Sequence, residues 1–318
     1  MIKVDVVIPV YNGVRFLNTV IESVSKQSYP LNRIIVVDDG STDSTKKNLN
    51  DLEAVHKNLF TISVEHAGLS AARNSGWKSS DAEFIAFLDV DDTWSSTKIE
   101  SQVNHLKDHI DCNFVYSSSR ILQEGDSKVS YLDGINNSPA NPLNILTKRF
   151  VLSGSASSVM MRRSLLGELN GFDEELKYGE DLDLWIRASK ITDFCHVPSR
   201  DVNILKAYGG MQSNVRGLEN VFKHNTLILK MIEKNFSNSN LAKYRRELRS
   251  IFWGDLKKNL FFGLFHFRKI YSEFRVCFPV ASRLLFHSFF DFLMSFVSVI
   301  IVRFGRILRR KLGFANEY

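Results

Sequence analysis

Cysteine is scarce in this chain of 318 residues, and the few cysteines present follow no recognisable pattern. Cys112, Cys195 and Cys277 are odd in number, lie far apart and include no C-x-x-C pair. Disulfide frameworks and structural zinc sites are marked by even-numbered or closely spaced cysteines. We therefore expect neither a disulfide framework nor a zinc site, and we expect a reducing, cytoplasmic compartment.

The N-terminal residues lack the features of a signal peptide. Lys3, Asp5 and Pro9 interrupt the apolar run at the start of the chain, and no small-residue cleavage site follows it. The run therefore predicts a strand. The chain also lacks a G-x-G-x-x-G sequence after any predicted strand, which disfavours a nicotinamide-dependent dehydrogenase.

Positive charge is unevenly distributed along the chain. The net charge is +6, but residues 243–318 carry 15 Lys and Arg against 5 Asp and Glu, a net +10, and residues 1–242 carry a net −4. A nucleic-acid-binding protein would place positive charge on the domain that holds the site, together with surface aromatic residues or a known motif. We therefore predict no nucleic-acid partner, and we expect the basic tail to meet an anionic membrane surface.

Short β-branched runs alternate with helical patterns in the N-terminal half, which is typical of an α/β fold with a mostly parallel sheet and crossover helices. The hydrophobic content of 44% is sufficient for a sizeable core. Glu124, Gly125 and Asp126 predict a hairpin turn between two alternating runs. The predicted strands are residues 4–10, 33–38, 60–64, 83–88, 113–118, 155–161, 192–197 and 203–208.

Two regions of different composition divide the chain. Apolar residues recur at helical spacing between the first two predicted strands, and the α/β pattern continues to about residue 215. Beyond it the pattern is helical, and 14 of the 24 phenylalanines lie at or after Phe252. We therefore predict an α/β domain over residues 1–215 and a helical, basic, Phe-rich region over residues 216–318.

Three carboxylates follow a predicted buried strand. Asp89, Asp91 and Asp92 come directly after residues 83–88, at the carboxyl end of the strand, where open α/β sheets bind ligands. Residues two apart in a strand share a face, which points Asp89 and Asp91 the same way. Like charges that converge need a cation or hydrogen-bond donors, and hard oxygen ligands favour Mg²⁺ or Mn²⁺. A solvated acidic turn is the alternative.

A second pair of carboxylates, Asp38 and Asp39, ends the second predicted strand and runs into Gly40 and a series of Ser and Thr residues. One carboxylate would face inward, which leaves the other to accept hydrogen bonds from a base or ribose. An ordinary strand-to-helix junction explains the same residues, because Gly permits a tight turn and Ser and Thr cap helices. The first predicted strand ends in the same manner, with Pro9 ending the ladder and Tyr11 placed to lie against a nucleotide.

Five motifs occur along the chain in a fixed order. They are residues 8–12 (IPVYN), 37–43 (VDDGSTD), 66–76 (HAGLSAARNSG), 89–92 (DVDD), and 171–174 (GFDE) with 179–185 (GEDLDLW). On these motifs the sequence resembles the family-2 glycosyltransferases, which have the GT-A fold, a Rossmann-like α/β architecture, invert the anomeric configuration and use nucleotide sugars. The resemblance covers about residues 3–215 and does not extend into the tail.

The resemblance implies a role for each residue that matches a family motif. Asp91 is the implied metal ligand, since the last carboxylate of the family's D-x-D motif holds a divalent cation, Mn²⁺ or Mg²⁺, and Asp89 lies on the ribose side. Asp181 is the implied general base, which takes the proton of the acceptor hydroxyl. The residues implied in binding the nucleotide sugar are Pro9, Tyr11, Asn12, Asp39, Arg73 and Asp89.

Helix capping is the alternative role for several of these positions. Glu180 and Asp181 are acidic residues at a predicted helix start, which the helix dipole favours. Arg73 and Asn74 are also explained as residues that cap and pair at the end of a short helix. We expect His66 to be a loop residue rather than a ligand.

The chain departs from the family pattern downstream of the implied base. Many members place a third metal ligand there, a histidine, near a segment that resembles residues 206–213 (KAYGGMQS). No histidine lies between His196 and His224 in this chain. Either water or Gln212 substitutes for the missing ligand, or a loop is arranged differently.

The tail contains an apolar stretch of 19 residues, 284–302, with Asp291 near its middle. That length is close to the roughly 20 residues needed to cross a bilayer, but a central Asp costs about 2.5 to 3.5 kcal/mol on insertion scales. Asp291 shares one polar stripe with a histidine and two serines, and a basic cluster follows at residues 303–311. The pattern favours peripheral attachment to a membrane. A true span, and a helix packed on the α/β domain or in a homodimer, are the alternatives.

Together these features predict a hexosyltransferase-type glycosyltransferase on the inner face of the cell membrane. It would move a sugar from a nucleotide diphosphate sugar, we expect a UDP-sugar, to a hydroxyl of a glycan or lipid-linked acceptor during synthesis of cell-surface polysaccharide or glycoconjugate. A sugar-phosphate nucleotidyltransferase is one alternative, but such enzymes have a Gly-rich phosphate loop where this chain offers only Gly13. An inactive homologue that scaffolds a polysaccharide-assembly complex is another, against which Asp91 and Asp181 argue.

Overall fold

The structure is a computed structural model of the chain. It divides into two units, Met1–Arg216 and Gly217–Tyr318, and the second unit lies outside the described residues. The basic tail and the boundary near residue 215 therefore stay predictions, as does a part for Gln212. The described residues are 1–125, 129–133, 135–136, 140–141, 144–145, 150–152, 155–176 and 179–206.

The first half of the described chain forms parallel strands joined by helices. Its elements are β1 (Val4–Val10), α1 (Val14–Ser25), β2 (Arg33–Asp39), α2 (Thr45–Val55), β3 (Leu59–Val64), α3 (Leu69–Ser79) and β4 (Phe84–Phe87). The strands lie in the order β3-β2-β1-β4, and every neighbouring pair is parallel. This part confirms the predicted parallel sheet and the first four predicted strands. The fifth predicted strand, at 113–118, is also confirmed, but the observed strand is longer, Phe114–Gln123.

The second half adds strands of both directions to this sheet, and it also contains a separate sheet of two short antiparallel strands, the eighth and ninth of the chain. Its elements are β5 (Thr93–Trp94), α4 (Lys98–Asp108), β6 (Phe114–Gln123), β7 (Val129–Leu132), β8 (Ile135–Asn136), β9 (Phe150–Val151), a 3₁₀ turn η1 (Ala156–Ser158), β10 (Val159–Arg162), α6 (Arg163–Glu168), α7 (Glu180–Ala188) and β11 (Phe194–Lys206). β10 is antiparallel to both of its neighbours, β4 and β6, whereas β11 is parallel to β6. The sheet is therefore parallel in its first four strands and mixed beyond them.

Two of the later predictions differ from the structure in detail. The separate strands predicted at 192–197 and 203–208 are one strand, β11, whose pairing with β6 shifts register between Val197 and Val202. The strand predicted at 155–161 begins as η1, and only its second part belongs to β10. The continuity of β11 depends on its pairing with β6, a distant segment, which local hydrophobic patterns do not record.

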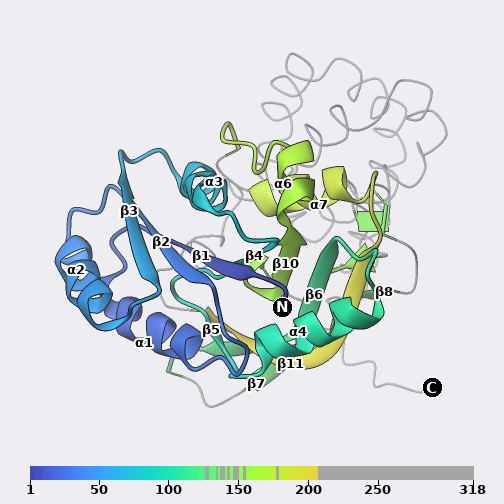
Figure 1. Ribbon diagram of the computed structural model, residues 1–318, viewed down its shortest axis with the longest axis horizontal. Coiled ribbons are helices and arrows are strands. Elements are labelled where there is room, and N and C mark those ends of the chain that lie inside the picture. The colour runs from blue at the N-terminus through green and yellow to red at the C-terminus, as the bar shows by residue number, and fades with distance from the viewer. Residues whose placement is uncertain are drawn as a thin grey trace, which may run out of the picture. The chain divides into compact units, whose positions relative to one another are not determined.

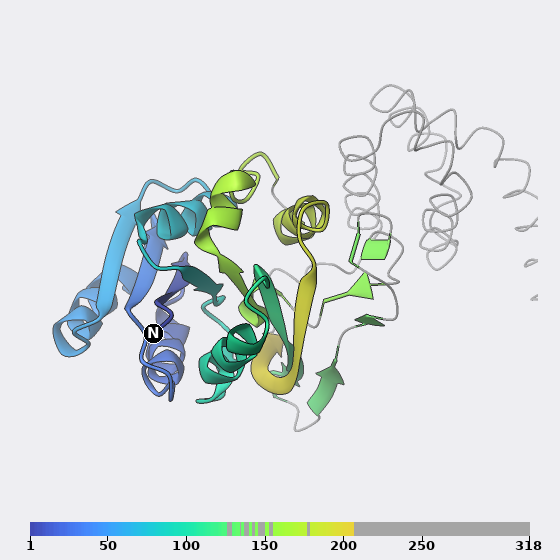
Figure 2. The same ribbon diagram turned by 45° about the vertical axis from the view of Figure 1, so that its right-hand side comes forward.

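Helices cover both faces of the sheet. Figures 1 and 2 show α1, α2 and α4 on one face and α3, α6 and α7 on the other. The predicted apolar face of α1 is buried against the sheet through Leu17, Val20, Ile21 and Val24. A sheet covered on both faces has strands that are apolar throughout, and every residue of β1 and β4 is buried.

A glycine lets α3 lie close to the sheet. A Cβ atom at Gly76 would collide with the side chain of Val7 on β1 and would lie tightly against Val37 on β2. The close approach fixes where α3 stands relative to the carboxyl ends of these two strands. Arg73 and Asn74, one turn earlier on the same helix, are both buried.

One expectation about cysteine is wrong. Cys112 and Cys195 form a disulfide, with Cα atoms 6.4 Å apart. Cys112 precedes β6, and Cys195 lies near the start of the adjacent parallel strand β11, where its neighbour Phe194 pairs with Phe114. Strand pairing brings the two sulfurs together although 83 residues separate them. Their spacing in the sequence therefore gave no sign of the bond.

Membrane attachment was predicted for a part of the chain outside the described residues. In the part that the structure describes, no helix has both the length and the apolar character to cross a bilayer. The predicted peripheral attachment through residues 284–302 and the basic cluster after them stays a prediction.

Candidate active site

The carboxyl ends of β1, β2 and β4 meet at one edge of the sheet. β1 pairs in parallel with β2, with Val10 opposite Asp38, and with β4, with Val7 opposite Phe87. Parallel neighbours end at the same edge, so the residues that follow them gather there. These are the three segments that the sequence singled out, at residues 11–13, 38–43 and 88–92.

The loop after β1 and the loop after β2 are tied together by Asn12. Its side-chain Oδ1 accepts hydrogen bonds from the N–H groups of Thr42 (2.8 Å) and Asp43 (3.2 Å), and its own N–H donates to Ser41 Oγ (2.8 Å). Asn12 has a φ of 49°, in the left-handed region that Asn tolerates better than most residues. Asn12, which was predicted to bind the nucleotide sugar, therefore shapes the edge of the site.

Asp39 is buried, and its carboxylate holds the loop that leads into α3. Its oxygens accept hydrogen bonds from the N–H groups of Ala67 (2.8 Å) and Gly68 (3.0 Å), and His66 Nδ1 lies 2.9 Å from Oδ2. The preceding Asp38 accepts from the N–H of Ser41 (3.0 Å), as expected of a residue that closes a tight turn. The predicted contact of one of this pair with a base or ribose stays a prediction, and the structure shows that Asp39 positions the 66–68 loop.

Tyr11 and His66 form an exposed aromatic pair beside Asp39. Their rings are stacked with centroids 4.2 Å apart, and Tyr11 is 46% exposed. Pro9, in contrast, is buried within β1 opposite Val37, so the strand continues to Val10 and does not end at the proline. Of the residues predicted to bind the nucleotide sugar in this segment, Tyr11 and Asn12 are exposed and Pro9 is buried.

The three carboxylates after β4 have separate roles. β4 ends at Phe87, and the next residues form a turn in which the N–H of Asp92 donates to Asp89 O (3.0 Å). The strand alternation predicted for Asp89 and Asp91 therefore does not apply. Asp92 is buried and structural: it accepts hydrogen bonds from Ser157 Oγ (2.6 Å) and from the N–H of Leu205 (3.0 Å).

Asp91 keeps its carboxylate available. Among the described residues, no hydrogen bond or ion pair from another residue engages its side-chain oxygens, and only its own backbone N–H interacts with them. Burial, and then the neighbouring charge of Asp89, raise the pKa of Asp91, while Arg15 opposes them at longer range. A half-buried carboxylate that lacks its own cation is a hard oxygen ligand of the kind that Mg²⁺ or Mn²⁺ accepts.

The chemistry of this segment therefore fits a divalent cation at Asp91, with Asp89 nearby. Within the described residues, however, no group of three or more His, Cys, Asp or Glu side chains could hold a metal ion. Magnesium typically keeps several waters and uses one or two carboxylates together with substrate phosphates. A site of that kind agrees with the single free carboxylate observed here.

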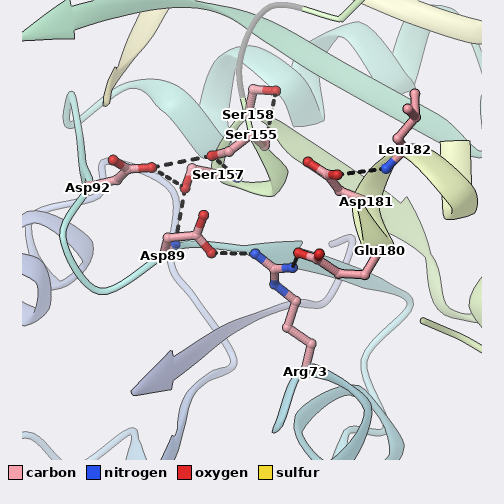
Figure 3. Close-up of polar contacts among 9 residues, drawn as sticks. All are labelled: Arg73, Asp89, Asp92, Ser155, Ser157, Ser158, Glu180, Asp181 and Leu182. Carbon is pink, nitrogen blue, oxygen red and sulfur yellow. Dashed lines mark hydrogen bonds and ion pairs between the residues drawn. The ribbon is translucent and has the colours of Figure 1, made fainter. Parts of the chain in front are cut away.

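Arg73 joins the loop after β4 to the start of α7. Its side chain is 2% exposed, its Nη2 donates to Asp89 Oδ1 (2.6 Å), and its Nη1 donates to Glu180 Oε1 (2.8 Å) (Figure 3). Burial opposes the charge of the guanidinium, but Asp89 and Glu180 outweigh it and raise the pKa of Arg73. Arg73 is therefore a fixed cation between two acidic segments.

Asp181 lies beside this bridge, in the first turn of α7. Its Oδ1 accepts a hydrogen bond from the N–H of Leu182 (2.7 Å) (Figure 3). Burial, and then the charge of Glu180, raise the pKa of Asp181 to about 6, while Arg73 opposes them. A carboxylate with its pKa raised toward neutrality is a stronger base than an ordinary Asp, which suits proton abstraction.

Comparison with known proteins identifies the family of the chain. The model of Glycosyl transferase family 2 matches residues 5–169. The chain belongs to glycosyl transferase family 2. Among curated family-2 relatives, an uncharacterized glycosyltransferase of Rickettsia bellii is 33% identical over 59% of this chain and 26% of its own length. The glucosyltransferase WfgD of Escherichia coli is 31% identical over 47% of this chain and 62% of its own length.

A solved structure shares the fold. TarS of S. aureus (residues 1–349, in complex with UDP-GlcNAc) superposes with a TM-score of 0.61 at 20% identity, over 80% of this chain and 72% of that one. The likeness agrees with the predicted GT-A fold. The chain spans only about a quarter to a third of the length of the first curated relatives that it matches.

Two polar residues support the candidate site although the sequence predicted no such role for them. Asn74 donates to Phe172 O (2.8 Å) and accepts from Phe172 N–H (2.9 Å), so it fastens α3 to the loop before α7. Ser157 Oγ accepts from the N–H of Asp89 (3.0 Å) and donates to Asp92 (Figure 3). Asn74 lies in a motif that had been noted, but nothing in the sequence around Ser157 indicated contact with residues more than sixty positions away.

Proposed function

We propose that this protein transfers a sugar from a nucleotide diphosphate sugar, a UDP-sugar, to an acceptor hydroxyl with inversion. Membership of glycosyl transferase family 2 supports the transfer of a sugar. The main structural support is the pair of ion pairs made by Arg73. They join Asp89, just after β4, to Glu180, the neighbour of Asp181. The bridge supports a single site in which donor and acceptor groups meet.

The proposed donor subsite lies along the ends of β1, β2 and β4. The exposed ring of Tyr11 would lie against the base, with Asn12 and Asp39 shaping the edge around it and Pro9 supporting it from within β1. Asp89 would approach the ribose, while Asp91 would hold a divalent cation. Such a cation, when bound, supplies positive charge beside the departing diphosphate.

The proposed general base is Asp181. The acceptor hydroxyl would donate its proton to the Asp181 carboxylate as the hydroxyl oxygen attacks the anomeric carbon from the face opposite the leaving group. Displacement in one step needs no covalent intermediate, and inversion follows from the direction of attack. The raised pKa of Asp181 supports this role, because it increases the affinity of the carboxylate for the proton that it takes.

The names of similar proteins support a role in the synthesis of cell-surface polysaccharide or glycoconjugate. WfgD is named as a transferase that takes glucose from UDP-Glc to a GlcNAc-diphosphoundecaprenol acceptor, and the TarS structure contains UDP-GlcNAc. We accordingly propose a hexosyl donor and a glycan or lipid-linked acceptor. Attachment of the tail to the inner face of the cell membrane, or its use in a homodimer, would bring the site near such an acceptor.

The function is tested by a panel of nucleotide sugars. Binding of each is measured by thermal shift with and without Mn²⁺, and transfer or hydrolysis of the donor is then followed for those that bind. We expect a UDP-sugar to raise the unfolding temperature, and Mn²⁺ to increase that effect in the wild type but not in Asp91→Asn. No response to any nucleotide sugar would contradict the proposal.

Two alternatives remain distinguishable in the same assay. A sugar-phosphate nucleotidyltransferase would release pyrophosphate from a nucleoside triphosphate and a sugar phosphate, and a glycosyltransferase would not. An inactive scaffold homologue would bind a donor without hydrolysing or transferring it. The available carboxylate of Asp91 and the strong base at Asp181 favour the active enzyme.

A further inference from the structure

Glu180 is the first residue of α7 and the immediate neighbour of the proposed base. The residue before it, Gly179, has a left-handed φ of 71°, so the chain turns sharply into the helix at this point. The Glu180 side chain is only 12% exposed and points to Arg73. An acidic side chain that merely favoured the helix dipole would not need this burial or this partner.

The position of Asp181 depends on how the first turn of α7 is held. Asp181 accepts its hydrogen bond from Leu182, within its own helix, so this bond does not fix the helix against the rest of the site. The contact of Glu180 with Arg73 does so, because Arg73 is buried on α3 and is held on its other side by Asp89. Figure 3 shows Asp89, Arg73 and Glu180 in a row, with Asp181 next to the last of them.

The guanidinium is well suited to hold both carboxylates at once. Each terminal nitrogen serves one carboxylate, and the planar fork fixes the angle between the two partners. The ring of Phe172 lies 5.2 Å from the guanidinium carbon and closes one side of the group. A lysine at this place would keep the charge but would not have the fork.

On this evidence, and resting on the proposed function, we propose that Glu180 is a positioning residue that acts through Arg73 to hold Asp181 in place for proton abstraction. Glu180 touches neither substrate in this account. Its effect on catalysis comes from the geometry of the first turn of α7 and from its charge beside Asp181. The charged groups that act on Asp181 are Glu180 on its own helix, Arg73 on α3 and Asp89 after β4.

The test compares Glu180→Gln with Glu180→Asp and with Glu175→Gln in the full chain. Glu175 is an exposed acid in the same region without contact to Arg73, so it controls for the loss of a charge. We expect Glu180→Gln to lower kcat by roughly 10- to 100-fold, the loss typical of a misplaced catalytic group, with a smaller change in donor KM. Glu180→Asp should recover part of the loss, and Glu175→Gln should match the wild type.

The pH profile separates positioning from simple stability. Without the Glu180 charge, the acidic limb of kcat should move to lower pH, because that charge raises the proton affinity of Asp181. Unfolding temperatures of the three variants, measured alongside, identify any loss of fold. Wild-type kcat and an unmoved acidic limb in folded Glu180→Gln would overturn the inference.

A double-variant cycle tests whether Glu180 acts through Arg73. If it does, the double variant Glu180→Gln with Arg73→Lys should be little less active than the less active of the two single variants. Fully additive losses would overturn the inference while leaving the proposed function intact. Absence of transfer by the wild type with every donor would instead remove the proposed function, and this inference with it.

Discussion

The imidazole of His66 lies flat against the phenol ring of Tyr11, with ring centroids 4.2 Å apart and an angle of 25° between the planes. The Nδ1 atom of the same imidazole lies 2.9 Å from Asp39 Oδ2. His66 therefore connects two residues that were predicted to bind the nucleotide, although His66 itself was predicted to be a loop residue rather than a ligand. Its side chain is 56% exposed, so a ligand at Tyr11 would meet it directly.

Replacement of His66 by Ala should weaken nucleotide binding. An aromatic pair contributes about 0.5 to 1.5 kcal/mol beyond its buried area, so we expect the Kd for UDP to rise roughly 2- to 12-fold. Isothermal titration with UDP measures the effect. His56→Ala is the matched control. His56 is a partly exposed histidine at the end of α2, and its side chain contacts Ser25 on α1. Binding by His66→Ala that equals or exceeds the wild type would show that His66 does not support the nucleotide.

Replacement of Ser157 by Ala should destabilise the turn that presents Asp89 and Asp91. The change removes the hydrogen bond to buried Asp92 and leaves the N–H of Asp89 without its acceptor. An unsatisfied buried group costs about 1 to 3 kcal/mol, which for a domain of this size lowers Tm by roughly 2 to 12 °C. Thermal unfolding measures the shift.

Ser79→Ala provides the control for that experiment. Ser79 Oγ also donates a hydrogen bond, but its acceptor is the backbone carbonyl of Gly76 at the end of α3, away from the residues of the site. It should change Tm by much less than Ser157→Ala. Equal Tm for the two variants would mean that Ser157 is not the support of the turn.

Activity should rise with pH through the pKa of Asp181. A general base must be ionised to accept a proton, and burial followed by the charge of Glu180 raises the pKa of Asp181 to about 6. We therefore expect kcat/KM to increase about tenfold per pH unit below that value and to level off above it. Initial rates from about pH 5 to about pH 8 at constant ionic strength measure the profile. A rate that stays constant throughout would contradict the assignment of Asp181 as base.

The same shift has a consequence for stability. Because the folded-state pKa of Asp181 is raised, the protonated carboxyl favours folding at low pH, and this contribution is lost as the pH rises toward about 6. The side chain at position 181 cannot ionise in the Asp181→Asn variant. The Tm of the variant minus the Tm of the wild type should therefore increase as the pH rises toward about 6, and it should stay increased at neutral pH. A difference in Tm that is the same at low and neutral pH would contradict the raised pKa.

Local patterns in the sequence were enough to place the strands that build the site edge. Val4–Val10 and Phe84–Phe87 are short apolar runs followed by polar turns, and the parallel arrangement then puts Asp39, Asp89 and Tyr11 at one edge. Asp39, Asp89 and Asp91 could be named for the same reason, because they lie at or just after the ends of β2 and β4. Asp181, in the first turn of α7, was named from the resemblance to the family-2 glycosyltransferases.

The supporting contacts could not be predicted, because they join segments far apart in the sequence. Ser157 reaches Asp89 and Asp92 through the turn η1, and Arg73 reaches Glu180 across more than one hundred residues. The disulfide between Cys112 and Cys195 has the same origin, in the pairing of β6 with β11. Such contacts depend on tertiary structure, which hydrophobic period and turn residues do not encode.

In the proposed enzyme, donor binding and proton abstraction occur in one site with separate residues for each task. Asp181→Asn separates the two, with donor binding measured by titration and transfer measured by product formation on the same preparation. We predict a Kd for the donor within about twofold of the wild type and a fall in kcat of at least ~100-fold, within the range by which general-base catalysis accelerates reactions. Normal transfer by Asp181→Asn would contradict the account.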